Sequence, residues 1–156
     1  PITLWEALAG KFVAAWLFIG IALVLTFPMV LTVAYLGSPD YGIIFSSYLG
    51  SFMLSGAFLA VTCLFSAMTK NQVISFVISV VACFSMLMLG VGVFTDFLNR
   101  YLPVWLSDAI SAFSFFTHYQ GFQRGLIDSR DLVYFVSVIV FMLAANALVL
   151  ERKKAE

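Results

Sequence analysis

The sequence predicts an all-α, multi-pass transmembrane helical bundle, and two observations carry that prediction. First, 63% of the 156 residues are hydrophobic and only 10% are charged, whereas soluble domains have roughly 25% charged residues. Second, four apolar stretches lack Asp, Glu, Lys, Arg and His, and each is close to or above the ~20 residues that cross a bilayer. They are residues 12–36, 43–68, 73–94 and 132–150. We expect helices there, within one transmembrane domain over residues 1–156, because hydrocarbon offers backbone groups no other partner.

The distribution of charge predicts an orientation and excludes some partners. The 8 basic and 8 acidic residues cancel, so nothing indicates a nucleic-acid partner. With both termini and the turn at 69–72 on one side, that side collects five of the eight basic residues. They are Lys11, Lys70, Arg152, Lys153 and Lys154, which leaves Arg100, Arg124 and Arg130 on the other side. By the positive-inside rule, both termini are predicted to be cytoplasmic.

Residues 1–11, within "PITLWEALAGKF", are predicted to form a short capped cytoplasmic helix that leads into the first span. Thr3 and Glu6 have the spacing of a capping box, in which each side chain accepts a hydrogen bond from the other residue's backbone. Trp5 and Leu8 lie on its apolar side. Trp5 is either an anchor for a partner protein or a residue of the headgroup belt. Further along, Pro28 is expected to kink the first span.

The loop "GSPDYG" and the segment 95–131 are predicted to face the outer side of the membrane. Within it, residues 103–117 are apolar but too short to cross, so we expect short interfacial or re-entrant helices. The final helix is expected to begin at Asp128 as its N-cap, with Asp131 in the acidic first turn.

His118 is the only histidine, in the most polar long stretch of the chain. It is either part of interfacial structure or a catalytic group. Nearby serines and Asp108 match no nucleophile motif, and the two cysteines lie in spans, so no metal site or disulfide is predicted. Arg124 with Asp128 is either a helical i, i+4 pair or a substrate clamp.

Small residues recur every four positions in the second and third spans: at Ser47, Ser51 and Ser55, at Gly56 and Ala60, and again at Ser75 and Ser79. This spacing lets helix backbones approach closely, and the alternative is a hydroxyl-lined path for a polar substrate. Asn146 is expected to form an interhelical hydrogen bond.

Three stretches carry a resemblance to a known family. They are "PITLWEALAGKF", "SAMTKNQVISFV" and "THYQGFQRGLIDSRDLVYFVSVIVFMLAANALVLERKK". Their order resembles the second half of a type-2 ABC transporter permease, of the subgroup with gliding-motility and nitrous-oxide-reductase-maturation permeases. The resemblance covers essentially the whole chain, which corresponds to the C-terminal two-thirds of a six-span permease without its first two spans.

This resemblance implies a permease subunit of an ATP-driven exporter in the bacterial cytoplasmic membrane. It implies an ABC ATPase subunit as partner, a dimer of permease subunits, and contact with membrane lipids. Residues 1–11 would be the coupling helix, with Thr3, Trp5, Glu6 and Leu8 touching the ATPase. The chain has no Walker A motif, GxxxxGK[ST], so ATP hydrolysis is expected in the partner, with no catalytic residue, cofactor or metal here. The alternative is a membrane-embedded enzyme acting on a lipid or lipid-linked substrate at the outer face.

Overall fold

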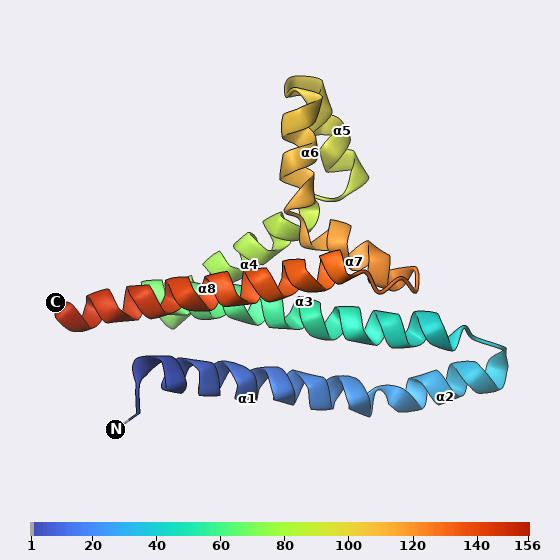
Figure 1. Ribbon diagram of the computed structural model, residues 1–156, viewed down its shortest axis with the longest axis horizontal. Helices are drawn as coiled ribbons and strands as arrows, with labels where there is room; N and C mark the ends of the chain where they lie inside the picture. Colours follow the sequence, from blue (N-terminus) through green and yellow to red (C-terminus); the bar gives the residue numbers. More distant parts are fainter. Residues whose placement is uncertain (1) are drawn as a thin grey trace.

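The chain folds as an all-α bundle with a helical hairpin projecting from one side (Figure 1). The computed structural model describes residues 2–156, so Pro1, the first residue of the predicted coupling helix, lies outside the described residues. The helices are α1 (Leu4–Leu25), α2 (Phe27–Leu36), α3 (Tyr41–Met68), α4 (Gln72–Met88), α5 (Gly92–Tyr101), α6 (Val104–Ala112), α7 (Phe115–Gln123) and α8 (Ser129–Ala155).

Three helical segments are long and apolar enough to cross a membrane: Leu4–Leu36, Tyr41–Met68 and Ser129–Ala155. These lengths and compositions are those of a multi-pass membrane protein, as the sequence predicted. The first segment is not straight. α1 ends at Leu25 and α2 begins at Phe27 with Pro28 in its first turn, which confirms the predicted break at this proline. At this break, the side-chain hydroxyl of Thr26 donates a hydrogen bond to Leu23 O at 2.6 Å.

The predicted span 73–94 differs from the structure. α4 ends at Met88, and α5 leaves at a bend of 78°, so the pair forms a broken span or a re-entrant loop. Gly90, which lies between Met88 and α5, and Gly92, which begins α5, explain this break. Glycine disfavours helix continuation, and a Cβ on Gly90 would lie 2.5 Å from both Ser114 Oγ and Thr117 Oγ1. The chain therefore turns where α7 packs against it.

The predicted separate helix at 1–11 also differs, because α1 runs without interruption from Leu4 into the first span. No break occurs in residues 4–25, where Gly10 lies in open space, Gly20 lies against Phe52 of α3, and the other residues are good helix formers or apolar. The capping box itself is confirmed: Thr3 and Glu6 each accept a backbone hydrogen bond from the other.

α3 is the central helix and packs against α1, α4, α7 and α8. Its buried side is made of small residues, among them Gly56, Ala57 and Ala60. Trp16 lies against Gly56, where an added Cβ would come within 2.7 Å of the indole. This close approach supports the packing interpretation of the small-residue stripes. Ser79 in α4 agrees with it, since it is buried and donates to Ser75 O at 2.7 Å.

Asn146 does not fulfil its predicted role. The side chain is 2% exposed, yet its Oδ1 has no hydrogen-bond partner among the described residues.

Candidate functional site

Polar side chains gather at two places on the bundle, one at the start of α1 and one where α6, α7 and α8 meet. The first contains all four residues that the sequence singled out for partner contact. Thr3 N donates to Glu6 Oε2 at 2.9 Å, and Glu6 N donates to Thr3 Oγ1 at 3.3 Å. These bonds satisfy amide groups that a helix start otherwise leaves free, so the first turn of α1 is held in shape although it is exposed.

The start of α1 lies beside the end of α8. A groove of about 310 Å³ runs between them, lined by Ile2, Thr3, Leu4, Ala7, Leu8, Lys11, Leu150 and Lys154. Next to it, Lys153 Nζ donates to Ala67 O at the end of α3. The basic residues that the sequence assigned to one side therefore do lie at one end of the bundle.

The four predicted contact residues divide into two groups here. Thr3 and Leu8 line the groove, and Leu8 is half-buried there against the end of α8. Trp5 is not part of the groove and is 48% exposed, while Glu6 is exposed beside it. Leu8 thus lines a groove within the chain, and Trp5 is a large exposed side chain outside that groove.

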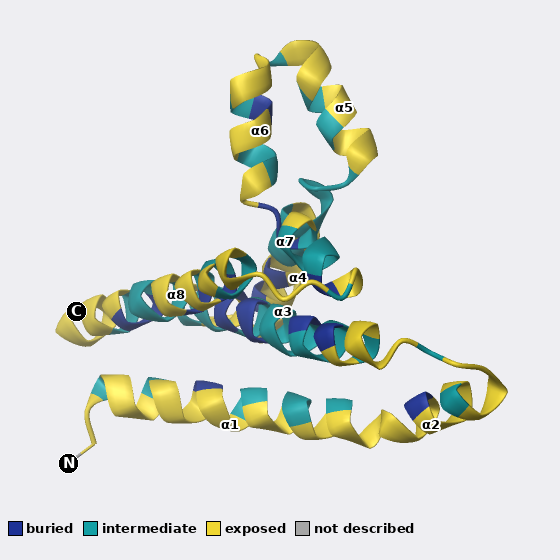
Figure 2. Cartoon of the chain, turned by 45° about the vertical axis from the view of Figure 1, so that its right-hand side comes forward, coloured by how far each residue is buried: buried dark blue, intermediate teal, exposed yellow. Residues whose placement is uncertain are grey.

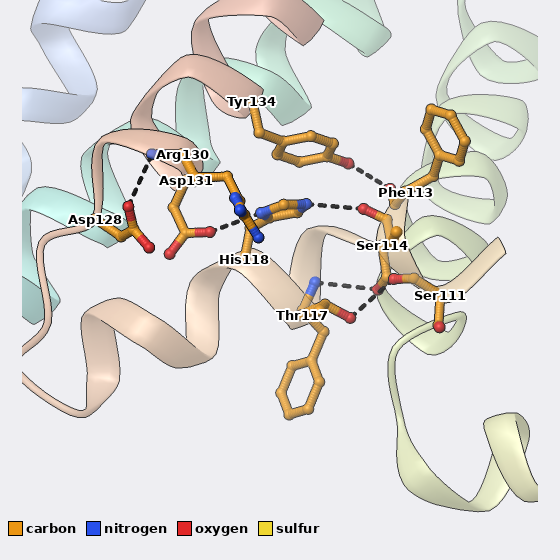
Figure 3. A network of polar contacts seen from close by, with 11 residues as sticks. Ser111, Phe113, Ser114, Thr117, His118, Asp128, Arg130, Asp131 and Tyr134 are labelled. Carbon is orange, nitrogen blue, oxygen red and sulfur yellow. Dashed lines mark hydrogen bonds and ion pairs between the residues drawn. The ribbon is translucent and has the colours of Figure 1, made fainter. Parts of the chain in front are cut away.

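The second polar place is centred on His118 in α7 (Figure 3). Its Nδ1 lies 2.7 Å from Asp131 Oδ1 in the first turn of α8, and its Nε2 lies 2.8 Å from Ala112 O at the end of α6. The imidazole stacks on Tyr134, with ring centroids 3.7 Å apart and planes 15° from parallel. Tyr134 in turn donates its hydroxyl to Phe113 O. One side chain thereby joins three consecutive helices.

The hydrogen-bond partners limit the roles of the two ring nitrogens. A carbonyl oxygen can only accept, so Nε2 must carry a hydrogen and donate it to Ala112 O. Nδ1 faces the Asp131 carboxyl at 2.7 Å, so this nitrogen is engaged in a hydrogen bond as well.

The same contacts limit what His118 can do chemically. A general base needs a free nitrogen within reach of a substrate proton, and both ring nitrogens are already engaged. The neighbouring hydroxyls are engaged too: Ser114 Oγ donates to Met86 O at 2.9 Å, and Thr117 Oγ1 donates to Ser111 O at 2.9 Å. Within residues 2–156, no group of three or more His, Cys, Asp or Glu side chains could hold a metal ion. The geometry favours the interfacial-structure interpretation.

The predicted pairing of Arg124 with Asp128 is wrong. α7 ends at Gln123 with Arg124 as its C-cap, Gly125 follows with φ +80°, and Asp128 caps α8 by accepting from Arg130 N at 3.0 Å. The left-handed glycine breaks the helix between the two side chains, so the i, i+4 spacing has no structural meaning there. The predicted N-cap at Asp128 and acidic first turn at Asp131 are both confirmed.

The contact of His118 with Asp131 was missed by the sequence analysis. The two residues are thirteen positions apart and belong to different helices, so no helical periodicity relates them. The only available signal was that the single histidine and an acidic helix start lie in one short interfacial segment. Tyr134 and Phe113 gave no signal, because aromatic residues are common throughout this chain.

Comparison with protein-family models, with curated proteins and with solved structures finds no match to the chain.

Proposed function

We propose that the chain is a membrane-spanning permease subunit of an ATP-driven ABC transporter, and that it works as an exporter with a separate ATPase. The proposal rests on the resemblance to type-2 ABC permeases and on one structural observation. That observation is the capped, exposed start of α1, which continues directly into a membrane span and carries a free tryptophan.

The length of this first segment supports a role outside the hydrocarbon. Leu4–Leu36 contains 33 residues, which at 1.5 Å per residue is about 50 Å of helix. The hydrocarbon core is only about 30 Å thick. A turn or more of helix must therefore extend beyond it, and Lys11 marks a position where the chain is expected to meet the headgroups. The residues before Lys11 would then stand in water, where an ATPase could contact Trp5.

The location we propose is the bacterial cytoplasmic membrane, with both ends of the described chain on the cytoplasmic side. The basic groove between α1 and α8 supports this orientation, because Lys11, Lys153 and Lys154 lie at that end. A dimer of permease subunits belongs to the same proposal. The enzyme alternative, with His118 acting at the outer face, is less well supported because both nitrogens of its ring are engaged.

The experiment that tests this function is affinity isolation of the protein from its native membrane, followed by an assay for ATP hydrolysis. We expect wild-type protein to bring down a subunit that hydrolyses ATP, and Trp5→Ala to recover much less of it. Truncating an interface tryptophan typically costs about 2 kcal/mol or more, which is roughly a 30-fold loss of affinity. Trp105→Ala is the matched control, since Trp105 is also exposed but lies on the projecting hairpin.

The outcomes separate the alternatives. Equal recovery with wild type and Trp5→Ala would refute the anchor role and leave Trp5 as a headgroup-belt residue. Absence of ATP hydrolysis from every preparation, together with turnover of a lipid-linked substrate by the protein alone, would refute the permease and favour the enzyme.

A further inference from the structure

The groove between α1 and α8 carries two positive charges, one from each helix. Figures 1 and 2 place the start of α1 and the end of α8 at the same end of the molecule, and most of both segments is exposed in Figure 2. Lys11 of α1 and Lys154 of α8 line the groove, and none of its eight lining residues is an aspartate or a glutamate. The lining of this cavity is therefore cationic.

Neither lysine is neutralised within the described part of the chain. The acids nearest to them in the sequence are Glu6, Glu151 and Glu156, and all three lie outside the lining of the groove. The one ion pair within residues 2–156 joins His118 to Asp131, where α7 meets α8. The two ammonium groups thus have no carboxylate partner, and an anion from outside the described chain would supply the counter-charge.

The remainder of the groove is largely apolar and has room for more than a small ion. Its volume is about 310 Å³, and Leu8 and Leu150 are among its walls. Ala7 lies one turn from Lys11 on the same face of α1, and its methyl group fills little of the space between the helices. A ligand with both an anionic group and an apolar part gains from such walls, whereas a hydrated phosphate ion does not.

The groove lies where the spans leave the hydrocarbon. The apolar stretch of α1 begins directly after Lys11, that of α8 ends at Leu150, and both residues line the groove. The end of α3 is at the same level, because Lys153 Nζ donates to Ala67 O. The headgroup layer beyond the hydrocarbon is roughly 5–7 Å thick, which is about four residues of helix. Lys154 follows Leu150 by this interval, so the two groove lysines bracket the headgroup layer.

We propose that the groove between α1 and α8 binds the phosphate of an anionic membrane phospholipid, with Lys11 and Lys154 facing its charge and the apolar walls facing its glycerol backbone. Basic pockets between transmembrane helices bind anionic headgroups in other membrane proteins. The inference goes beyond the proposed transport function and does not depend on an ATPase, because it uses only the groove and its level in the membrane. Trp5, the proposed contact with the ATPase, lies outside the groove.

Titration of the full chain in detergent micelles with phosphatidylglycerol, followed by native mass spectrometry, tests this site. Phosphatidylcholine is titrated in parallel, since it has the phosphate but no net charge. The variants are Lys11→Gln, Lys154→Gln and the combination of both. Lys70→Gln is the matched control, because Lys70 is also an exposed lysine at this end of the bundle but does not line the groove.

We expect wild-type protein to bind phosphatidylglycerol more tightly than phosphatidylcholine. Each groove substitution should weaken the binding of phosphatidylglycerol about fivefold and the double substitution about 25-fold, as is typical of basic residues near an anionic lipid surface. Lys70→Gln should leave the affinity nearly unchanged. Ala7→Phe, which fills the groove but keeps both lysines, should also lower it, and thermal unfolding checks that each variant is folded.

Four results would overturn the proposal. Equal affinity for the two lipids would refute a site for an anionic lipid. Equal losses in Lys70→Gln and the groove variants would show attraction by general surface charge. Unchanged binding in folded Ala7→Phe would place the lipid outside the groove. Displacement of phosphatidylglycerol by millimolar inorganic phosphate would identify a site for a soluble anion instead of a lipid.

Discussion

His118 in α7 contacts both α6 and α8, close to the turns that join these helices to α7. Its ring is held by Asp131, by Ala112 O and by the face of Tyr134, and its side chain is 13% exposed. A group with this many partners fixes the angle of the α5–α6 hairpin relative to α8.

Replacing His118 should therefore affect stability more than chemistry. We expect His118→Ala to lower the free energy of unfolding by about 1–3 kcal/mol, because it leaves Asp131 and Ala112 O without partners. Denaturant unfolding in detergent micelles measures this, with the exposed Gln123→Ala of the same helix as control. His118→Gln should keep ATPase coupling within a few fold. A loss of ~100-fold or more in a folded variant would instead identify a general acid or base.

Gly56 gives a second prediction at the level of single residues. An added methyl would meet Trp16 at 2.7 Å, and the indole cannot move freely because its Nε1 donates to Phe52 O at 2.8 Å and its ring stacks on Phe52 at 4.6 Å. Gly56→Ala should thus destabilise the protein by about 1–3 kcal/mol. Gly10→Ala, in open space on α1, should stabilise it by about 0.5–1 kcal/mol. Thermal unfolding of both variants checks the prediction, and equal shifts would contradict it.

At the level of elements, the starts of α1 and α8 could be predicted from the sequence, and the bend between α4 and α5 could not. Thr3, Glu6 and Asp128 act on amides within their own first turns, so their spacing alone reveals their roles. The break after Met88 depends on Ser114 and Thr117 packing against Gly90, a contact across more than twenty residues. For the same reason the candidate site was only partly predicted: the capping residues were found, and the groove that Leu8 lines together with the end of α8 was not.

The capping box can be tested on α1 alone. Thr3→Ala removes the acceptor for Glu6 N and should cost about 1 kcal/mol, which corresponds to roughly fivefold faster hydrogen exchange in the first turn. Exchange measured by mass spectrometry on peptides from the first dozen residues reports this. Thr62→Ala is the control, because Thr62 bonds only to Phe58 O within α3 and caps nothing. Unchanged exchange in Thr3→Ala would show that the first turn is held by the groove with α8 instead.

On the scale of the whole molecule, the bundle has two chemically different ends. One end carries the start of α1, the end of α8 and the α3–α4 turn, joined by the contact of Lys153 with Ala67 O and rich in lysine. The opposite end carries the loop before α3 and the α7–α8 turn, where Gly125 packs against Ile43. This division is the physical basis of the proposed orientation, since cations near spans are retained on the cytoplasmic side.

The orientation itself is the last prediction. Single cysteines at Ser38, Ser129 and Ala155, introduced after Cys63 and Cys83 are replaced by alanine, all lie at exposed positions. In intact cells, Ser38→Cys and Ser129→Cys should react with a membrane-impermeant thiol reagent, because the loop before α3 and the start of α8 belong to the same outer end. Ala155→Cys should react only after the membrane is permeabilised, which also serves as the control that its thiol is accessible. Labelling of Ala155→Cys in intact cells, with protection of the other two, would invert the topology. The start of α1 would then lie outside the cell, where no ATPase could reach Trp5. That result would refute the proposed contact of residues 1–11 with the ATPase.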